Sequence, residues 1–455
     1  MPSIALPVSL RGQLLSGFRF SPLSLFTASE PGLWYDPSDL TTLFQDTAGA
    51  TPVTAPGQTV ARINDKSGRG NNATQATAAS RPTYGIVPLG GRRNIYTFTE
   101  QFGNADWSKT NTTIAADVEV APNGTTTADK LQENAGAAVY FSVGRNPSGT
   151  VSTAYTWSCY AKAAERSFLS VNFSVVGVIA SINLTTGATQ LNAGTATLQS
   201  TNVGSGWWRF SIAFTTAASG ANPLFHIITT DTAIGVPTVV GTAGFGFYLW
   251  GAQVELGSTA TAYQRVGTAF DVTEAGVQSL SYLSFDGVDD FLVTPTITPG
   301  IDKVQVFAGV RKLTDAANTI VESSLTSASN FGTFRLWGVS GGGFGFRSRG
   351  PSGTSPGDAT VGTPLAPTTQ VASGIGDLST DTSLLRLNGV QVASNSTDQG
   401  AGDYSAYPIY IGRRGGTLEP LSGNIYGLIV RFGSNLAAGA ITSTETFVNE
   451  KTGAY

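Results

Sequence analysis

A run of short strand-like segments between residues 94 and 266 constrains the fold of this chain most strongly. Apolar and polar residues alternate in 155–160 and again in 208–214, which is the pattern of half-buried antiparallel strands. Turn-forming residues separate such segments every ~8–12 residues, the spacing typical of β-sandwiches. The sequence therefore predicts a β-sandwich or jelly roll for this region.

The remainder of the chain is also predicted to be β-structure. After residue 267, strand-like segments alternate with Gly-rich loops, and Asn388-Gly389 between two apolar stretches is typical of a two-residue hairpin turn. Residues 440–451 lack Gly and Pro and predict one short helix. Residues 1–29 contain prolines and scattered Leu and Phe without periodicity, which favours an extended N-terminal arm. Its apolar side chains predict docking, either on a neighbouring chain or on its own domain.

Composition narrows the classes of function. Charged residues make up 12% of the 455 residues, against ~25% in a typical globular protein. With 26 basic and 30 acidic residues, a net charge of −4 and no basic cluster, the chain has no surface suited to a phosphate backbone. Nucleic acid is therefore not an expected partner. Hydrophobic residues reach 41%, which excludes a disordered chain and predicts compact domains.

The chain has one Cys and one His, which excludes an intrachain disulfide and a His-rich metal site. Cys159 has no partner for an intrachain disulfide, and His226 alone excludes a His-rich zinc or iron site. His226 alternates with apolar residues, so we interpret it as a strand residue and not as a catalytic base. The first residues lack the continuous apolar core of a secretory signal, and no segment approaches ~20 apolar residues. We expect synthesis in the cytoplasm without membrane insertion.

Two phrases carry a resemblance to a known domain. The segment 32–84, which begins GLWYDPSDL and ends SRPTY, and the later phrase YLSFDGVDDFL resemble the concanavalin A-like, laminin-G-like lectin domain of structural proteins from tailed bacteriophages. In that family the two phrases are nearly adjacent. Here residues 85–281 separate them, which predicts that a second module interrupts the first.

The intervening residues resemble a different module. The phrases NIYTFTEQFGNADW, at 94–107, and WGAQVELG, at 250–257, followed by Tyr263, are similar to the ends of a carbohydrate-binding-module-like jelly roll that recurs in phage fibre and other virion proteins. We predict an all-β chain of two β-sandwich or jelly-roll modules, one inserted into the other. The arm would be 1–29, the discontinuous lectin-like domain 30–92 with 267–455, and the insert 93–266.

One dense carboxylate cluster lies in the phrase FDGVDDF. Asp286, Asp289 and Asp290 fit three interpretations: a tight turn between strands, a Ca²⁺ site, or the carboxylate pair of a glycoside hydrolase. The resemblance favours the turn, because this phrase is a landmark of the fold. The Glu-x-Asp-x-Glu strand of concanavalin-like glucanases is absent. We therefore expect no catalytic residues and no cofactor, with Ca²⁺ at the three aspartates as the metal alternative.

Aromatic and basic residues near turns are candidates for sugar contacts, because sugars stack on exposed rings. The candidates are Trp107, Trp207, Trp208 and Arg413. The alternative for each tryptophan is burial, and the alternative for Arg413 is a solvated hairpin end. Other aromatic and acidic residues are interpreted as parts of the folded core or of the module ends: Trp34, Trp157, Trp250, Glu255 and Tyr263.

The resemblance implies a non-enzymatic structural protein on the outer surface of a tailed-phage virion. Such a fibre, spike or head-decoration subunit, in head or tail, would attach to host-surface polysaccharide through weak, multivalent contacts. The arm would bind other virion proteins, and fibres of this kind are commonly homotrimers. Two alternatives stay open. A glycan depolymerase would use Asp286 with Asp290, and a purely architectural subunit would bury Trp107 and Trp207.

Overall fold

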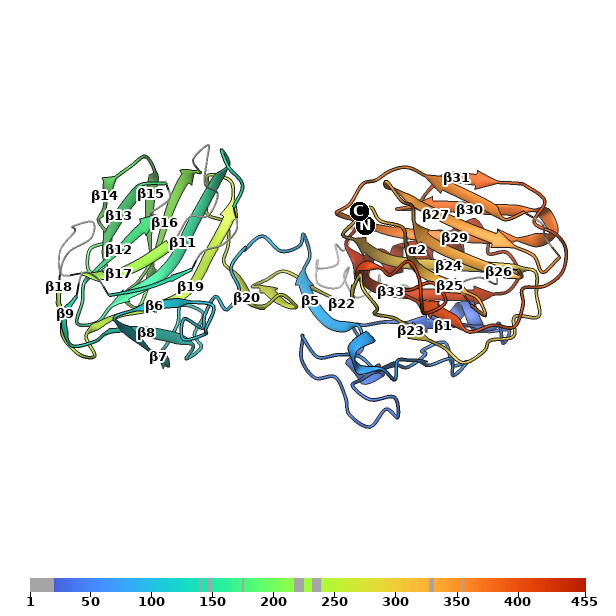
Figure 1. Cartoon of the computed structure of the whole chain (residues 1–455), viewed down its shortest axis with the longest axis horizontal. Helices are drawn as coiled ribbons and strands as arrows, with labels where there is room; N and C mark the ends of the chain where they lie inside the picture. The colour runs from blue at the N-terminus through green and yellow to red at the C-terminus, as the bar shows by residue number, and fades with distance from the viewer. Residues whose placement is uncertain are drawn as a thin grey trace, which may run out of the picture. The chain divides into compact units, whose positions relative to one another are not determined.

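The computed structural model describes residues 20–138, 141–145, 149–173, 176–216, 225–230, 239–326, 331–352 and 355–455. The chain is all-β, with one α-helix among these residues (Figure 1). It divides into two compact units. We call Met1–Ile86 with Leu280–Tyr455 the discontinuous unit, and Val87–Ser279 the inserted unit.

The discontinuous unit has two antiparallel sheets. One has the order β5-β22-β33-β24-β29-β30-β31, with β1 also pairing with β33. The other has the order β2-β3-β4-β23-β32-β25-β26-β27-β28. The strands of the first sheet are β1 (Gly32–Tyr35), β5 (Thr83–Pro88), β22 (Ser279–Asp286), β24 (Lys303–Lys312), β29 (Thr368–Asp377), β30 (Thr382–Leu387), β31 (Val390–Asn395) and β33 (Ser422–Phe432). Those of the second are β2 (Leu43–Phe44), β3 (Arg62–Ile63), β4 (Ala73–Thr74), β23 (Leu292–Val293), β25 (Asn318–Ser323), β26 (Thr333–Gly338), β27 (Phe344–Arg349), β28 (Gly357–Val361) and β32 (Ile409–Ile411).

One apolar core joins these two sheets into a sandwich. Val306 and Leu428 of the first sheet and Phe334 and Phe346 of the second belong to the same buried cluster. Long runs of buried residues, such as the six of β26, explain why these strands lack the simple alternation of a one-sided sheet. Short 3₁₀ turns connect the strands: η2 (Leu40–Thr42), η3 (Ala78–Ser80) and η4 (Leu378–Thr380).

Two local predictions are confirmed in this unit. The predicted helix is α2 (Ala438–Thr452), and it ends at Gly453, whose φ of +61° and N–H to Asn449 form a left-handed cap. The predicted hairpin joins β30 to β31, with φ of +49° at Asn388 and +80° at Gly389.

The described part of the N-terminal arm packs on its own unit. Its 3₁₀ turn η1 (Pro22–Phe26) buries Leu25 and Phe26 against Trp34 and against Val448 of α2. The Arg431 guanidinium adds one hydrogen bond, from its Nε to the Leu25 carbonyl at 2.7 Å. Of the two predicted docking modes, residues 20–29 adopt the one on the chain's own domain. Residues 1–19 of the predicted arm lie outside the described residues.

The inserted unit is a second sandwich. One sheet has the order β14-β13-β12-β17-β10-β6 and the other β15-β16-β11-β19-β8-β7, with a separate pair β18-β9. The strands of the first sheet are β6 (Ser108–Thr110), β10 (Ser142–Arg145), β12 (Phe168–Phe173), β13 (Val178–Asn183), β14 (Thr189–Ala193) and β17 (Phe225–Thr230). The others are β7 (Thr112–Glu119), β8 (Ala128–Glu133), β9 (Gly136–Ala138), β11 (Ala154–Ala163), β15 (Thr197–Gly204), β16 (Trp207–Thr215), β18 (Val239–Gly241) and β19 (Gly246–Leu256).

Large apolar side chains from both sheets fill this second core. Val171 of β12 meets Trp157 of β11 and Phe210 of β16 in one buried cluster. Cys159 lies in the same core, and burial raises the pKa of its thiol to about 12, so the thiol stays protonated. His226 lies on β17, where its backbone pairs with Gly144 and Asn172.

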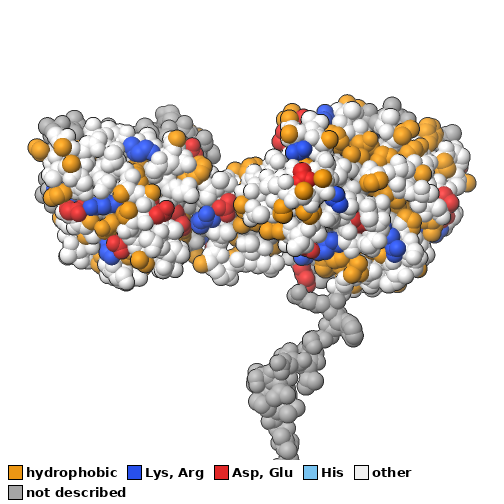
Figure 2. Space-filling view, turned by 90° about the horizontal axis from the view of Figure 1, so that it is seen from below, with side chains coloured by type: hydrophobic (Ala, Val, Ile, Leu, Met, Phe, Trp, Pro, Cys, Tyr) orange, Lys and Arg blue, Asp and Glu red, His pale blue; other side chains and the backbone are white. Residues whose placement is uncertain are grey.

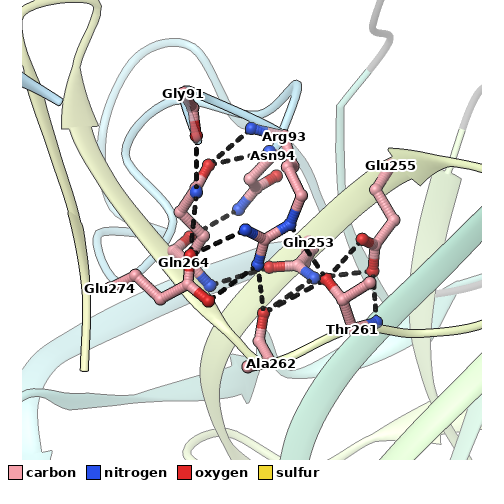
Figure 3. Close-up of polar contacts among 9 residues, drawn as sticks. All are labelled: Gly91, Arg93, Asn94, Gln253, Glu255, Thr261, Ala262, Gln264 and Glu274. Atoms are coloured by element: carbon pink, nitrogen blue, oxygen red, sulfur yellow. Dashed lines mark hydrogen bonds and ion pairs between the residues drawn. The ribbon is translucent and has the colours of Figure 1, made fainter. Parts of the chain in front are cut away.

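A polar clamp closes the inserted unit where its two ends meet (Figure 3). The Asn94 side chain donates to the carbonyls of Ala252 and Gln264, and the Gln264 amide oxygen accepts from the N–H groups of Arg93 and Asn94. The Arg93 guanidinium makes a two-pronged ion pair with Glu274, at 2.7 and 2.9 Å. The segment that enters the unit is thereby tied to residues near the unit's end, the geometry that lets a module sit within a loop of another.

The inserted unit extends beyond 93–266 at both ends. The hairpin of β20 (Gln264–Thr268) and β21 (Asp271–Glu274) continues it past the last phrase of the resemblance, and the Leu89 N–H donates to the Gln278 carbonyl. The prediction ended at the last recognisable phrase, and this hairpin has no distinctive residues of its own.

Charged side chains are sparse on the surface. In the face that Figure 2 shows, small groups of basic and acidic side chains lie scattered among uncharged ones. Among the residues that the structure describes, no helix combines the length and apolar character needed to span a bilayer.

Candidate functional site

A polar cleft in the inserted unit is the strongest candidate site. Its volume is ≈ 230 Å³, and three separate parts of the chain line it. They are the loop before β6, the region of β7 and the turn that follows it, and strand β20. The lining residues are Phe98, Thr99, Glu100, Gln101, Asp117, Thr127, Arg265, Val266 and Gly267. Two carboxylates, one guanidinium, two hydroxyls and one amide therefore converge on a single hollow.

Backbone hydrogen bonds fix the first wall of the cleft. Phe98 and Thr99 donate from their N–H groups to the carbonyls of Gly267 and Val266, both at 3.1 Å. The Trp107 indole N–H donates to the Phe98 carbonyl at 3.0 Å from behind the wall. Phe98 has a φ of +53°, a left-handed conformation that few non-glycine residues adopt. These contacts hold the segment that presents Glu100 in one conformation.

Glu100 is the most enclosed charged group of the cleft, with 12% of its side chain exposed. Its Oε1 accepts a hydrogen bond of 3.1 Å from the Tyr263 hydroxyl, and its Oε2 lies 3.8 Å from the Arg265 guanidinium. Arg265 also pairs with Asp271 at 2.9 Å. Burial raises the pKa of Glu100, and Arg265 and Tyr263 oppose that rise because they favour the ionised form.

Asp117 enters the cleft from a break in the β7–β8 pairing. The register shifts between Ala115 and Glu119, and Asp117 has a φ of +55°. Asp129 holds this bulge, because its carboxylate accepts from the N–H groups of Asp117, at 3.1 Å, and Phe102, at 2.8 Å. Burial raises the pKa of Asp129 to about 6. Bulges commonly redirect a side chain next to a binding site, and here the bulge presents the exposed Asp117 carboxylate.

An aromatic cluster supports the cleft from below. The rings of Trp250 and Tyr263 lie 4.6 Å apart between centroids, and Trp250 donates its indole N–H to the Thr127 hydroxyl at 3.1 Å. Gly251 between them in the phrase WGAQ has a φ of +64°, and a Cβ there would lie 3.1 Å from Tyr160 and 3.3 Å from Tyr263. Only glycine meets both requirements without strain.

The tryptophans predicted to stack on sugar do not form a platform. Trp107 and Trp207 are each only 1% exposed, so that prediction is wrong for both. Trp107 packs against Tyr96 and Phe102, and Trp207 donates its indole N–H to the Val120 carbonyl. Position near a strand end does not imply exposure, because both rings fold back over the core. Trp208 is half-buried, and its ring fills the space beside Gly187.

The predicted metal residues form a tight turn in the discontinuous unit. Carboxylate oxygens of Asp286, Asp289 and Asp290 all lie within 4.8 Å of one another. Asp286 accepts from the N–H groups of Val288 and Asp289, and Asp290 accepts from the N–H of Asp286. Burial, followed by the neighbouring charge of Asp286, raises the pKa of Asp290 to about 7. These contacts are those of the structural-turn interpretation, and the oxygens are close enough to share a cation.

Arg413 belongs to this turn and not to a sugar platform with the tryptophans. Its guanidinium donates to the backbone carbonyls of Asp289, at 3.3 Å, and Thr417, at 3.0 Å. Ser80 adds a hydroxyl hydrogen bond to the Asp289 carboxylate at 2.7 Å. The structure thus brings Arg413 together with the aspartates, which the sequence treated as separate candidates.

A second hollow, of ≈ 450 Å³, lies in the discontinuous unit beside η4 and contains four aspartates. Three of them already have partners: Asp302 pairs with Lys303, Asp381 accepts from the Gln399 N–H, and Asp398 accepts from the Gly400 N–H. Three of its four carboxylates are therefore already engaged by neighbouring protein groups.

Sequence reasoning missed the cleft although its signals were present. Glu100 lies in the phrase at the start of the inserted module, and Trp250 and Tyr263 lie in the phrase at its end. We interpreted Tyr263 as a fold-defining residue only. The convergence of the two phrases on one hollow is visible only once their segments are paired in space.

Comparisons with known proteins give little further guidance. No protein-family model matches the chain, and no curated protein matches it either. Among solved structures, the receptor-binding domain of botulinum neurotoxin mosaic serotype C/D matches with 10% identity and a TM-score of 0.29, over 36% of this chain and 42% of that chain. The Ruminococcus gnavus IT-sialidase CBM40 bound to α2,3-sialyllactose matches with 16% identity and a TM-score of 0.27, over 32% of this chain and 84% of that one. This chain thus spans less than half the length of the neurotoxin domain, and TM-scores of this size give no basis for transferring a ligand.

Proposed function

We propose that this chain is a non-enzymatic carbohydrate-binding protein whose inserted unit holds a sugar in the Glu100–Arg265 cleft. The observation that carries the proposal is the convergence of Glu100, Asp117, Thr127 and Arg265 on one open hollow. Carboxylates accept hydrogen bonds from sugar hydroxyls, and a guanidinium or an amide donates to them. A few convergent polar groups above an aromatic support are typical of small-molecule sites.

The size of the cleft indicates how much sugar it holds. Its ≈ 230 Å³ lies below the ~300–1,000 Å³ of pockets for drug-sized ligands. We therefore propose that one sugar residue enters it. Affinity per site would be low, and several copies of the chain on one particle would strengthen attachment by raising the effective concentration.

The biological setting is proposed from the sequence resemblance alone. The phrases of the two modules support an exterior subunit of a tailed-phage virion, a fibre, spike or decoration protein that attaches to host-surface polysaccharide. In this proposal the N-terminal arm contacts other virion proteins and the subunit is a homotrimer. An architectural role without sugar is the main rival, and the buried Trp107 and Trp207 favour it over any mode in which those rings touch sugar.

The test is retention of the full chain by surface polysaccharide from the host, with polymer length followed over time. We expect retention without shortening. The paired variant E100Q/D117N should lose retention, whereas D403N, which alters an exposed carboxylate of the discontinuous unit, should keep it. Retention that survives E100Q/D117N would contradict the cleft assignment, and no retention at all would favour the architectural role.

The same experiment tests a second function. Glu100 and Asp117 are two carboxylates lining one cleft, and burial raises the pKa of Glu100, as in an acid of a glycoside hydrolase. Shortening of the polymer by the wild-type chain, abolished in E100Q, would establish a depolymerase at this cleft and would remove the non-enzymatic proposal.

A further inference from the structure

We infer that the Glu100–Arg265 cleft selects neutral sugar residues and rejects acidic ones such as uronic or sialic acids. This inference rests on the proposed function, because it names the class of sugar that the same cleft takes. The inference follows from the charged residues that line the cleft and from the ion pairs that Arg265 already makes with protein carboxylates.

The lining is net acidic. Glu100 and Asp117 contribute two carboxylates, and Arg265 is the one basic residue among the described residues that line the cleft. Asp117 is exposed and has no ion pair among the described parts of the chain, so its charge is uncompensated. A ligand carboxylate in this small hollow would lie close to two like charges. Juxtaposed like charges of this kind are a common way to exclude a wrong ligand.

Arg265 is not available as an anion receptor. Carboxylate ligands are usually held by a guanidinium that offers two parallel N–H donors. Here one terminal nitrogen of Arg265 pairs with Asp271 at 2.9 Å, and its Nε faces Glu100 at 3.8 Å. Protein carboxylates thus lie on both sides of the guanidinium. Its remaining N–H groups are available to neutral acceptors.

The other polar groups suit hydroxyls. The Thr127 hydroxyl accepts from the Trp250 indole N–H and is hydrogen-bonded to the Thr125 hydroxyl at 2.8 Å, which in turn donates to Asn123, so its oxygen keeps one lone pair as an acceptor for a ligand hydroxyl. Glu100 receives the Tyr263 O–H on Oε1 and keeps Oε2 for another donor. A sugar hydroxyl both donates and accepts, so neighbouring hydroxyls of one sugar can donate to a carboxylate and to the threonine and accept from the remaining N–H groups of Arg265. An ionised carboxylate on the ligand accepts only, and it cannot donate to Glu100 or Asp117.

The test uses the full chain and an array of matched oligosaccharides that end in a neutral hexose, a hexuronic acid or a sialic acid, at low salt. We expect the wild type to prefer the neutral set by at least about tenfold in Kd, equivalent to roughly 1.4 kcal/mol. D271N removes the carboxylate that occupies Arg265 and should improve binding of the acidic sets by about tenfold. D403N serves as the matched control and should leave both preferences unchanged.

The outcomes separate the inference from the proposed function. A wild type that binds acidic sugars as well as neutral ones, with both signals lost in E100Q/D117N, would overturn the inference and leave the sugar-binding cleft standing. Unchanged affinity for acidic sugars in folded D271N would also overturn the inference. The ion pair with Asp271 would then not be what keeps Arg265 from binding a ligand carboxylate. Absence of binding to all three sets at millimolar sugar would remove both the inference and the proposed function.

Discussion

Each unit of this chain gathers carboxylates, but the two groups are built in opposite ways. In the discontinuous unit, Asp286, Asp289 and Asp290 come from one turn, and two of them accept hydrogen bonds from backbone N–H groups of that turn. In the inserted unit, Glu100 and Asp117 come from different segments, and neighbouring elements hold each in place. A cluster that is dense in sequence mainly stabilises its own turn, whereas a cluster assembled from distant segments leaves oxygens free for a ligand.

The largest effect is expected at Trp107, for which the sequence left two interpretations, contact with sugar or burial. Trp107→Ala should destabilise the inserted unit by about 3–5 kcal/mol, because it removes a large buried ring and the hydrogen bond to Phe98. Calorimetry of the full chain would detect a lower melting temperature for one unit. Trp208→Ala, at a half-buried ring of the same unit, provides the control and should cost less. A Trp107→Ala variant of wild-type stability that lost only sugar binding would restore the exposed-platform interpretation.

The aspartate turn should make the stability of the discontinuous unit depend on pH. The pKa of Asp290 is about 7 in the folded chain and ~3.9 when unfolded, so the folded state binds the extra proton between these values. Stability should therefore fall by up to about 1.4 kcal/mol per pH unit from pH ~4 to ~7 and level off above. D290N keeps an oxygen acceptor for the Asp286 N–H and should remove this slope.

The same turn can be tested for calcium binding by its effect on thermal stability. Melting temperatures at pH 8 would be compared in EDTA and in excess calcium. A cation shared by the three carboxylates would stabilise the ionised turn, and the gain would disappear in D290N. Equal melting temperatures in both solutions would leave the turn as a purely structural feature.

A moderate effect is expected where the inserted unit supports its enclosed carboxylate. Tyr263→Phe removes the O–H that donates to Glu100, which should cost about 0.5–1.5 kcal/mol of stability. That hydrogen bond favours the ionised carboxylate, so its loss should raise the pKa of Glu100 further. The pH at which sugar binding reaches half its maximum should then move upward, as measured by titration calorimetry. An unchanged midpoint would mean that Glu100 does not contact the sugar.

The sequence predicted the all-β class, the α2 helix and the Asn388-Gly389 hairpin, because each depends on local periodicity or on local backbone preference. It also indicated that Asp286, Asp289 and Asp290 lie together, since they are neighbours in one turn. It failed for Trp107 and Trp207, whose burial is decided by how their segments fold over the core. The cleft was missed for the same reason: its walls are far apart in sequence, and pattern reading gives no distances between them.

The smallest effect on stability is expected at the bulge that presents Asp117. Asp117→Gly relieves a φ of +55° but adds chain entropy to the unfolded state, so the two contributions should nearly cancel, within about 1 kcal/mol. Sugar affinity should nevertheless fall, because the exposed carboxylate is lost while the backbone bond to Asp129 is kept. Calorimetry paired with binding to neutral oligosaccharides would measure both quantities on one preparation. Asp286→Gly should behave in the opposite way, with lower stability and unchanged sugar affinity, because the Asp286 carboxylate accepts hydrogen bonds from two N–H groups of its own turn. If Asp117→Gly left affinity intact, the contrast between the ligand-facing and the turn-stabilising carboxylates would no longer hold.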